Sequence, residues 1–214
     1  MKALIYDGPK AVSYREVPDP IPGQDNLLIK ITAVGICGSD MHAYLGHDDR
    51  RPAPLILGHE AAGIISGGNK DGERVTINPL VSCSTCWACC NGRENICPNR
   101  QIISIPPREG AFAQYVTMPE RNLVTVPSDY YLQKAALVEP LAVGWHTAKL
   151  ALHKIDINME KNALVIGGGA IGLATALALR AMGIYDIVIS EFNPLRREYL
   201  QEHIDANIVE KAEG

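Results

Sequence analysis

Five of the six cysteines lie within one short segment, CSTCWACCNGRENIC. Four of them follow the spacing C-x2-C-x2-C-x7-C, at Cys83, Cys86, Cys89 and Cys97. Four thiolates at such short separations can surround a tetrahedral ion, so we expect a structural zinc site without an open coordination position. Cys90 is a surplus ligand, and the spacing also permits a set in which it replaces Cys89. An iron–sulfur site is the competing interpretation, but the spacing favours zinc.

A second group of candidate ligands comes from two segments upstream, GICGSDMH and LGHEAAG. Cys37, His59 and Glu60 offer sulfur, nitrogen and oxygen, the mixed set typical of a catalytic zinc that keeps one position free. Glu139, which precedes Pro140 at a predicted helix start, adds another carboxylate. A lone histidine or glutamate is more often an ordinary core or surface residue, so each is weak support by itself. The sequence leaves open whether Glu60 or Glu139 holds the metal.

A glycine-rich motif, G-x-G-x-x-G, follows a short apolar run in ALVIGGGAIG. We expect a parallel strand over 163–166 and a helix over about 170–182. Gly167 would make the tight turn, Gly169 would let the backbone approach a pyrophosphate, and Gly172 would allow the helix to pack closely on the sheet. The motif therefore predicts a dinucleotide-binding turn.

An acidic residue, Glu191, follows a second predicted strand over 187–189. Its distance from the glycines is near that at which a carboxylate meets the adenosine ribose hydroxyls, which favours NAD by repelling a 2′-phosphate. Arg196 and Arg197 lie close behind and could receive such a phosphate, so NADP stays open. Asn193 and Pro194 then predict the start of another helix, and ANIVE a third strand.

Several motifs occur in a fixed order: CGSDMH, GHEAAG, the cysteine segment, GAFAQYV, EPLAVG and VIGGGAIG. In this order they resemble the medium-chain zinc-dependent alcohol dehydrogenases over the whole chain. Glu139 places the resemblance nearer to the polyol, sugar-alcohol and threonine dehydrogenase branch, because simple alcohol dehydrogenases carry a cysteine there. The resemblance implies a zinc-dependent oxidoreductase that transfers a hydride from a secondary alcohol to NAD(P)+, with two zinc ions per chain.

The same resemblance implies roles for three residues after Cys37. Ser39 and His42 match the family's proton relay, and Asp40 matches the residue that supports the zinc-binding histidine. Without the resemblance to this family, Ser39 and Asp40 could be simple turn residues after Gly38. Arg50 and Arg51, in the segment expected to line the mouth of the substrate pocket, could meet a phosphate, but the favoured interpretation is that they are solvated side chains.

The elements that must position these residues form two domains. Alternating stretches over 27–34 and 113–118, separated by Pro and Gly turns, predict an antiparallel β domain over 1–148, by resemblance a GroES-like barrel, with the zinc lobe at about 82–100. A helical segment over 133–154 joins it to residues 149–214, the N-terminal portion of a Rossmann NAD(P)-binding domain. The predicted fold class is thus α/β plus β. A doubly wound domain needs about six strands, so we expect the chain to be a fragment.

Composition restricts the partners. The sequence has 20 Lys and Arg against 24 Asp and Glu, a net charge of −4, which is unsuited to nucleic acid or an anionic membrane. A small-molecule alcohol or polyol is the expected partner, and the resemblance implies a homo-oligomer at full length. No apolar run of signal-peptide length opens the chain, so we expect a cytoplasmic protein. A zinc-ribbon binding module and a catalytically inactive zinc-binding fragment are the alternatives.

Overall fold

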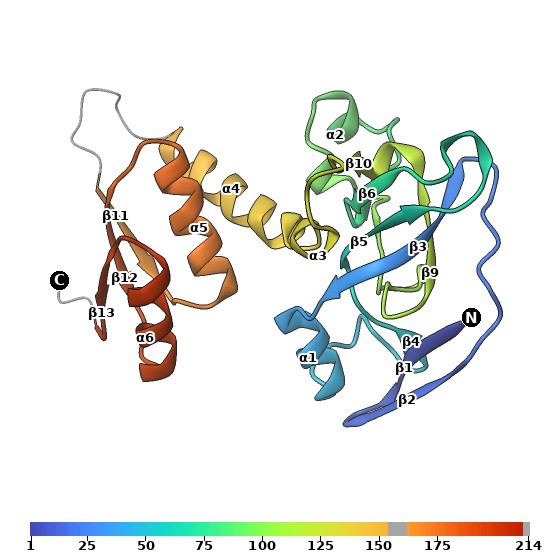
Figure 1. Cartoon of the computed structure of the whole chain (residues 1–214), viewed down its shortest axis with the longest axis horizontal. Coiled ribbons are helices and arrows are strands. Elements are labelled where there is room, and N and C mark those ends of the chain that lie inside the picture. The colour runs from blue at the N-terminus through green and yellow to red at the C-terminus, as the bar shows by residue number, and fades with distance from the viewer. Residues whose placement is uncertain (154–161, 212–214) are drawn as a thin grey trace. The chain divides into compact units, whose positions relative to one another are not determined.

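The described residues, 1–153 and 162–211 of the computed structural model, divide into two units, Met1–Glu139 and Pro140–Gly214 (Figure 1). The first unit consists mainly of antiparallel strands, and the second contains parallel strands and helices. The predicted change of architecture along the chain is therefore confirmed.

The main sheet of the first unit has five antiparallel strands in the order β10-β6-β5-β3-β9. Their bounds are β3 (Asn26–Gly35), β5 (Glu60–Ile65), β6 (Arg74–Ile77), β9 (Tyr115–Pro119) and β10 (Leu123–Thr125). The strand expected over 27–34 is confirmed by β3. The strand expected from residue 113 begins at Tyr115, because Ala113 instead bridges to Ala3 of another sheet.

That other sheet has three antiparallel strands in the order β2-β1-β4, namely β1 (Lys2–Gly8), β2 (Ala11–Glu16) and β4 (Leu55–Ile56). A short pair, β7 (Leu80–Val81) and β8 (Gln101–Ile102), frames the cysteine segment. Ile29, Ile103 and Met118 are fully buried in the core of this unit. Truncating such a side chain to alanine costs about 2–5 kcal/mol, so the core fixes the strands that carry the candidate ligands.

Short helices close the first unit. They are α1 (Gly38–Tyr44), α2 (Trp87–Cys90), α3 (Leu132–Ala135) and three single turns, η1 (Gly68–Lys70), η2 (Glu94–Ile96) and η3 (Glu120–Asn122). The helical segment expected over 133–154 consists of two helices, because α3 ends before α4 (Val138–Leu152) begins. Pro140 lies in the first turn of α4, where no N–H donor is needed, but in a continuous helix from α3 it would have to donate an N–H to the Ala136 carbonyl, and it has none. Lys154 lies outside the described residues.

The second unit has a three-stranded parallel sheet in the order β11-β12-β13. The chain runs through β11 (Asn162–Ile166), α5 (Ala170–Ala181), β12 (Asp186–Ser190), α6 (Pro194–His203) and β13 (Asn207–Val209). Asn193 caps α6 by accepting a hydrogen bond from the Arg196 amide at 3.2 Å. The predicted strands and helices of this half-sheet are confirmed. Residues 163–179 contain no charged side chain, and this run is divided between β11 and α5. No helix among the described residues is long and apolar enough to cross a membrane.

Candidate active site

A thiol, an imidazole and a carboxylate meet where two strands of the main sheet end. Cys37 follows β3 and precedes α1, whereas His59 and Glu60 enter β5, which is antiparallel to β3. One ligand atom from each of the three lies within 4.8 Å of the others. His59 and Glu60 are buried and Cys37 is half-buried. Hydrogen bonding between β3 and β5 thus brings together ligands separated by more than twenty positions.

Gly35 makes room for the carboxylate. It is the register partner of Glu60 across the β3–β5 pair, and a Cβ atom on it would overlap the Glu60 carboxylate oxygen Oε2. A side chain at position 35 would therefore push Glu60 out of the ligand group.

Asp40 connects the two ligand segments. Its carboxylate accepts hydrogen bonds from the backbone amides of Cys37 at 2.9 Å and Gly58 at 3.1 Å. Its Oδ1 atom also lies 3.7 Å from Nδ1 of His59, too far for a hydrogen bond but close enough for charge attraction. Asp40 is buried, so its charge is poorly screened by water. The predicted supporting carboxylate lies beside the histidine.

Cys37, His59 and Asp40 shift one another's pKa values. The neighbouring His59 lowers the pKa of Cys37, and Ser39 contributes in the same direction against the effect of burial. Burial lowers the pKa of His59, but the neighbouring Asp40 and Cys37 outweigh it and raise that pKa to about 10. Burial also opposes ionisation of Asp40, whose pKa is nevertheless lowered by His59 and by the Cys37 amide. The site therefore favours negative sulfur and carboxylate groups around a cation.

Glu139 is near this group but is not part of it. The described residues whose ligand atoms come together are Cys37, His59 and Glu60. Burial raises the pKa of Glu139, and the charges of Glu60 and Asp40 add to this effect. Of the two carboxylates left open by the sequence, Glu60 is the one placed among the ligand atoms.

The donor set fits a zinc ion. Sulfur, nitrogen and oxygen from three residues leave a fourth tetrahedral position free, as in catalytic zinc sites. Nδ1 of His59 is buried and has no hydrogen-bond partner among the described residues, so the ring orientation is set by charge and not by a fixed hydrogen bond. A metal bound to the ring would add the missing constraint.

The cysteine segment forms a second candidate metal site. The sulfur atoms of Cys83, Cys86, Cys89 and Cys97 all lie within 4.8 Å of one another. Four of the sulfur–sulfur distances are 3.5 Å for Cys83–Cys97 and for Cys86–Cys89, 3.9 Å for Cys83–Cys89 and 3.8 Å for Cys86–Cys97. Four sulfurs about 2.3 Å from a tetrahedral zinc lie about 3.8 Å apart. The observed spacing therefore matches a zinc site closed by four thiolates.

Cys90 lies outside this group. Its side chain is exposed, and its sulfur is 3.6 Å from the Thr85 carbonyl. Amides of Thr85 and Cys86 lower the pKa of Cys83 to about 5, which favours the thiolate that a metal requires. Of the two cysteine sets that the spacing permitted, the structure assembles the one with Cys89.

The glycine motif forms the turn between β11 and α5. Gly167 has a φ of +95°, which favours glycine, and a Cβ atom on Gly172 would overlap the Gly167 carbonyl oxygen. A Cβ atom on Gly169 would meet only Arg196 Nη1, at 3.8 Å, so its backbone is open to a ligand. This turn has the geometry of a phosphate-binding loop at a helix N-terminus.

Glu191 lies after β12 and folds back onto this loop. It accepts hydrogen bonds from the backbone amides of Gly168 at 2.8 Å and Asn193 at 2.7 Å. The Asn193 and Gly168 amides lower the pKa of Glu191, so the carboxylate is held in its ionised form. Arg196 Nη1 lies 3.7 Å from the same carboxylate.

Comparisons with known proteins agree with this geometry. Residues 23–128 match the family model of the alcohol dehydrogenase GroES-like domain. The chain is 36% identical to a sorbitol dehydrogenase of Bacillus subtilis, with 92% of the chain and 58% of that protein covered. It is 35% identical to an L-galactonate-5-dehydrogenase of Escherichia coli, with 98% and 62% covered. The chain belongs to the zinc-type alcohol dehydrogenase family.

A solved structure supports the same family. A protein described as a short chain alcohol dehydrogenase from Escherichia coli CFT073, solved with NADH, superposes with a TM-score of 0.86 at 28% identity, with 99% of this chain and 63% of that chain covered. The fold is thus the family's GroES-like domain followed by the first part of a Rossmann sheet, as predicted. The chain spans about 60% of the length of these relatives.

The two relay candidates of the family lie on one short helix. Ser39 and His42 are three residues apart on α1, so their side chains share a face. Ser39 is half-buried beside Cys37, whereas His42 is exposed. The helix therefore connects the ligand group to the surface.

The expectation that Arg50 and Arg51 are both solvated is wrong for Arg51. Arg50 is exposed and pairs with Asp48, but the Arg51 side chain is only 4% exposed. It forms an ion pair with Asp48 and donates to the Ser104 carbonyl at 3.0 Å. Sequence reasoning missed this residue because its partner carbonyl lies 53 positions away.

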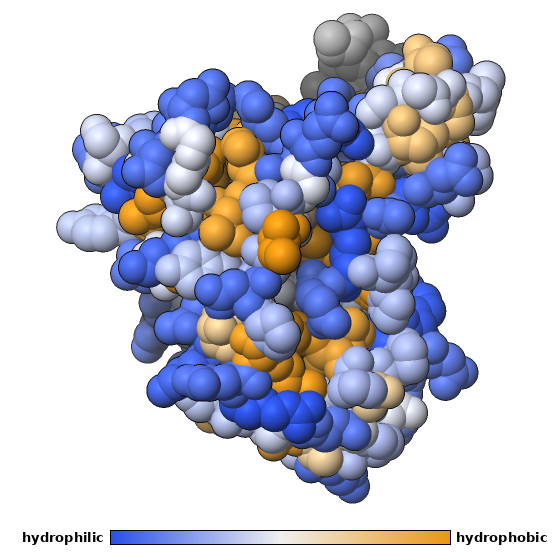
Figure 2. Space-filling view, turned by 90° about the vertical axis from the view of Figure 1, so that its right-hand side faces the viewer, coloured by the Kyte–Doolittle hydropathy of each residue, from blue (hydrophilic) through white to orange (hydrophobic). Residues whose placement is uncertain are grey.

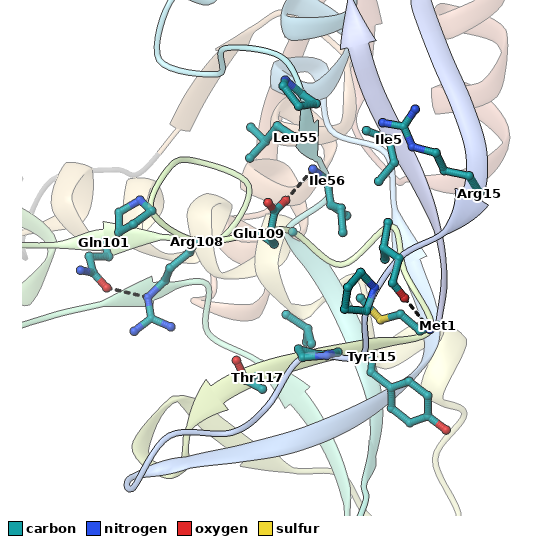
Figure 3. Close-up of a pocket in the computed structure, with 17 residues that line it drawn as sticks. Met1, Ile5, Arg15, Leu55, Ile56, Gln101, Arg108, Glu109, Tyr115 and Thr117 are labelled. Carbon is teal, nitrogen blue, oxygen red and sulfur yellow. Dashed lines mark hydrogen bonds between the residues drawn. The ribbon is translucent and has the colours of Figure 1, made fainter.

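The first unit contains a cavity of about 610 Å³ that is separate from the candidate metal ligands (Figure 3). Figure 3 shows Arg108 bonded to Gln101 on one side and the Met1 end on the other. The candidate metal ligands do not line it. The Cys37 group and this cavity are therefore separate features of the first unit.

Proposed function

We propose that this chain carries the metal-binding part of a zinc-dependent oxidoreductase that transfers a hydride from a secondary alcohol to NAD(P)+. The alcohol is of the polyol, sugar-alcohol or hydroxy amino acid type. In this proposal residues 1–148 form the catalytic domain, with the zinc lobe at about 82–100, and residues 149–214 begin the Rossmann NAD(P)-binding domain. The observation that carries the proposal is the meeting of Cys37, His59 and Glu60 within 4.8 Å.

Cys37, His59 and one carboxylate would hold the catalytic ion. Glu60 is the carboxylate favoured by its position, and Glu139, whose pKa is raised by burial and by the charges of Glu60 and Asp40, is the alternative. A zinc ion bound there supplies Lewis acidity, which can lower the pKa of a bound water from about 16 to about 7 and acts on an alcohol in the same sense. At 1.36 kcal/mol per pKa unit, this is on the order of 12 kcal/mol, more than an ordinary general base supplies.

The proton of the alcohol must still reach solvent. We propose that Ser39 accepts this proton while its own hydroxyl proton leaves, and that His42 releases a proton to solvent; the ribose of a bound cofactor would supply the hydroxyl that links the two. The shared face of α1 and the exposure of His42 support this route. Asp40 would not take part directly, but it would hold His59 and the Cys37 backbone in place.

The cofactor would bind at the turn of Gly167, Gly169 and Gly172. The ionised Glu191 repels a 2′-phosphate, so we propose NAD as the preferred form. Arg196 lies beside the Glu191 carboxylate, so its guanidinium is the group that could bind the 2′-phosphate of NADP.

The structural zinc would be held by Cys83, Cys86, Cys89 and Cys97. Its role would be to fix a segment without a packed core of its own. We further propose a cytoplasmic homo-oligomer. Unpaired cysteines suit a reducing compartment. Figure 2 shows hydrophobic residues gathered in patches between hydrophilic ones on one face, as surfaces that pack against other chain segments do.

The test uses the full-length protein that contains this chain. Purified protein is assayed for formation of reduced nicotinamide with a panel of polyols, sugar acids and threonine, using NAD+ and NADP+ separately. Bound zinc is counted by elemental analysis. We expect about two zinc ions per chain and turnover with at least one secondary alcohol.

Two variants sharpen the result. Cys37→Ser should remove one zinc ion and abolish turnover, whereas Cys90→Ser should retain both metal and activity. A wild-type protein that binds one zinc ion only and reduces neither nicotinamide would contradict the proposal and favour a zinc-ribbon module.

A further inference from the structure

Cys97 is the buried member of the four-cysteine group. It is 0% exposed, whereas Cys83, Cys86 and Cys89 are half-buried. Four thiolates around one Zn2+ leave a net charge of about −2. A charge out of water is costly unless hydrogen-bond donors face it. The donors that reach the Cys97 sulfur therefore influence how strongly this site retains a metal.

A backbone amide is such a donor. The N–H of Cys83 donates to Sγ of Cys97, with 3.5 Å between nitrogen and sulfur. The two residues are 14 positions apart, so this bond joins the two ends of the cysteine segment. Groups that hydrogen-bond to metal ligands orient them and tune the metal site. The direction and polarity of this one amide are therefore part of the site.

Arg121 holds the other end of the same peptide unit. The Ser82 carbonyl and the Cys83 N–H lie in one rigid, planar group. Arg121 Nη2 donates to the Ser82 carbonyl oxygen at 2.8 Å, from 39 positions along the chain. A charged donor at the carbonyl polarises the peptide, and such chains strengthen each hydrogen bond by about 10–30%. The contacts thus form one chain from guanidinium through peptide to sulfur.

The turn that carries Arg121 is itself fixed. Arg121 lies in η3, and its neighbour Asn122 is buried. The Asn122 side-chain amide donates to the carbonyls of Asn78 at 2.9 Å and Leu80 at 2.7 Å. The Asn122 carbonyl accepts in turn from the Asn78 amide at 2.8 Å. η3 is therefore attached to the segment that leads into the cysteine group, so the backbone of Arg121 has a defined position relative to Ser82.

We propose that Arg121 is a positioning residue for the four-cysteine metal site. By holding the Ser82 carbonyl, it aligns and polarises the Ser82–Cys83 peptide, so that the Cys83 amide donates to the Cys97 sulfur and the metal is retained. The proposal rests on the four-cysteine zinc site of the proposed function, but neither on hydride transfer nor on the Cys37 site.

Arg100 provides a matched control. Its Nη1 donates to the Cys97 carbonyl at 3.1 Å, so it also places a guanidinium on a backbone oxygen of the cysteine segment. That carbonyl belongs to the peptide before Pro98, which has no N–H that could act on a sulfur. Arg121→Met and Arg100→Met remove the same charge and the same donors but keep an unbranched apolar stem. Only Arg121→Met interrupts the chain to Cys97.

The first readout is the absorption of Co2+ at the four-cysteine site. Full-length protein with Cys37→Ser is loaded with Co2+, so that the thiolate-to-cobalt band comes from the four cysteines alone. A weaker N–H···S bond leaves the sulfur electrons less tightly held, so we expect Arg121→Met to move the band to longer wavelength. Arg100→Met should leave the band in place.

Arg121→Lys is a milder variant that serves if Arg121→Met does not fold, as judged by thermal unfolding. Lysine keeps the charge, but its single ammonium lacks the planar fork that fixes the direction of the hydrogen bond. We expect a smaller shift of the cobalt band in the same direction. Arg100→Lys is its control and should show no shift.

The second readout is the rate at which zinc passes from the same Cys37→Ser protein to a chromogenic chelator. Residues that support metal ligands change metal affinity by roughly 10- to 100-fold, so we expect transfer about 10-fold faster in Arg121→Met. Arg100→Met should stay close to the unsubstituted rate.

An unchanged band and an unchanged transfer rate in the Arg121 variants would overturn the proposal. An equal change in the Arg100 variants would also overturn it, because charge alone would then account for the effect. Failure of the Cys37→Ser protein to bind Co2+ would refute the four-cysteine site itself. Absence of dehydrogenase activity in the wild-type protein would refute the proposed oxidoreductase and leave the role of Arg121 standing.

Discussion

Asp40→Asn tests whether one buried carboxylate holds both ligand segments. Asp40 accepts from the Cys37 and Gly58 amides and faces His59, and it is only 3% exposed. The substitution keeps the size of the side chain but replaces one acceptor oxygen with an NH2 group. That NH2 group would face a backbone N–H, so one buried donor would lose its partner.

The expected cost follows from these contacts. Leaving a buried donor unsatisfied costs about 1–3 kcal/mol, and a hydrogen bond to a charged group contributes about 1.5–3 kcal/mol. We therefore expect the free energy of unfolding of the first unit to fall by about 2–3 kcal/mol. His59 would also lose its charged neighbour, and zinc affinity at the Cys37 site should fall by roughly 10- to 100-fold.

The pH dependence provides the sharper test. The pKa of Asp40 is lower in the folded protein than its ordinary value. Its contribution to stability is therefore present above about pH 3.9, the ordinary aspartate pKa, and is lost as the pH falls through the folded value. The stability difference between wild type and Asp40→Asn should be full at neutral pH and shrink on acidification.

Urea unfolding over a range of pH values measures this difference, with Asp49→Asn as a control at an exposed carboxylate nearby. The control should be within about 0.5 kcal/mol of wild type, as for ordinary surface substitutions. Equal stability of Asp40→Asn and wild type at neutral pH, or a difference that grows toward acid, would refute the reasoning.

Three other predictions concern the remaining sites. Cys89→Ser should lower the zinc content by about one ion and expose the cysteine lobe to limited proteolysis, and a matching loss in Cys90→Ser would contradict the assignment. Gly35→Ala should displace Glu60 and reduce zinc retention at the Cys37 site in dialysis against a chelator, while the four-cysteine zinc is kept. Glu191→Gln should raise the KM for NAD+ relative to that for NADP+. Because the pKa of Glu191 is lowered by folding, the same variant should also be destabilised at neutral pH but not at acid pH, measured by thermal unfolding.

The sequence was sufficient wherever the determining interactions are local. The cysteine spacing predicted a four-thiolate group, and the glycine motif predicted the turn between β11 and α5. The alternation of apolar residues located β3 in the same way. In each case the residues are close together along the chain or alternate within a single strand.

The choice between Cys89 and Cys90 required the phase of a helix. α2 begins at Trp87, so successive residues on it point about 100° apart. Cys89 then faces Cys83 and Cys86, whereas Cys90 faces solvent. Spacing alone could not supply this phase, because a helix of one turn has no apolar period to read.

The sequence could not predict long-range contacts such as those of Arg51, for a different reason. Arg50 and Arg51 are chemically identical neighbours, and nothing local distinguishes the exposed one from the buried one. The difference comes from the Ser104 carbonyl and from Ser39, which lie in other segments. Only the folded chain brings these acceptors to position 51.

The same contacts explain why α1 forms at all. A helix of seven residues is unstable by itself, because nucleation is not repaid over so short a length. Here Asp40 is tied to Gly58, 18 positions later, and Ser39 to Arg51, 12 positions later. The helix that carries the relay candidates is therefore defined by tertiary contacts on its buried side. Substitutions on its exposed side, such as Met41→Ala, should leave the ligand group intact, whereas loss of either tie should disturb it.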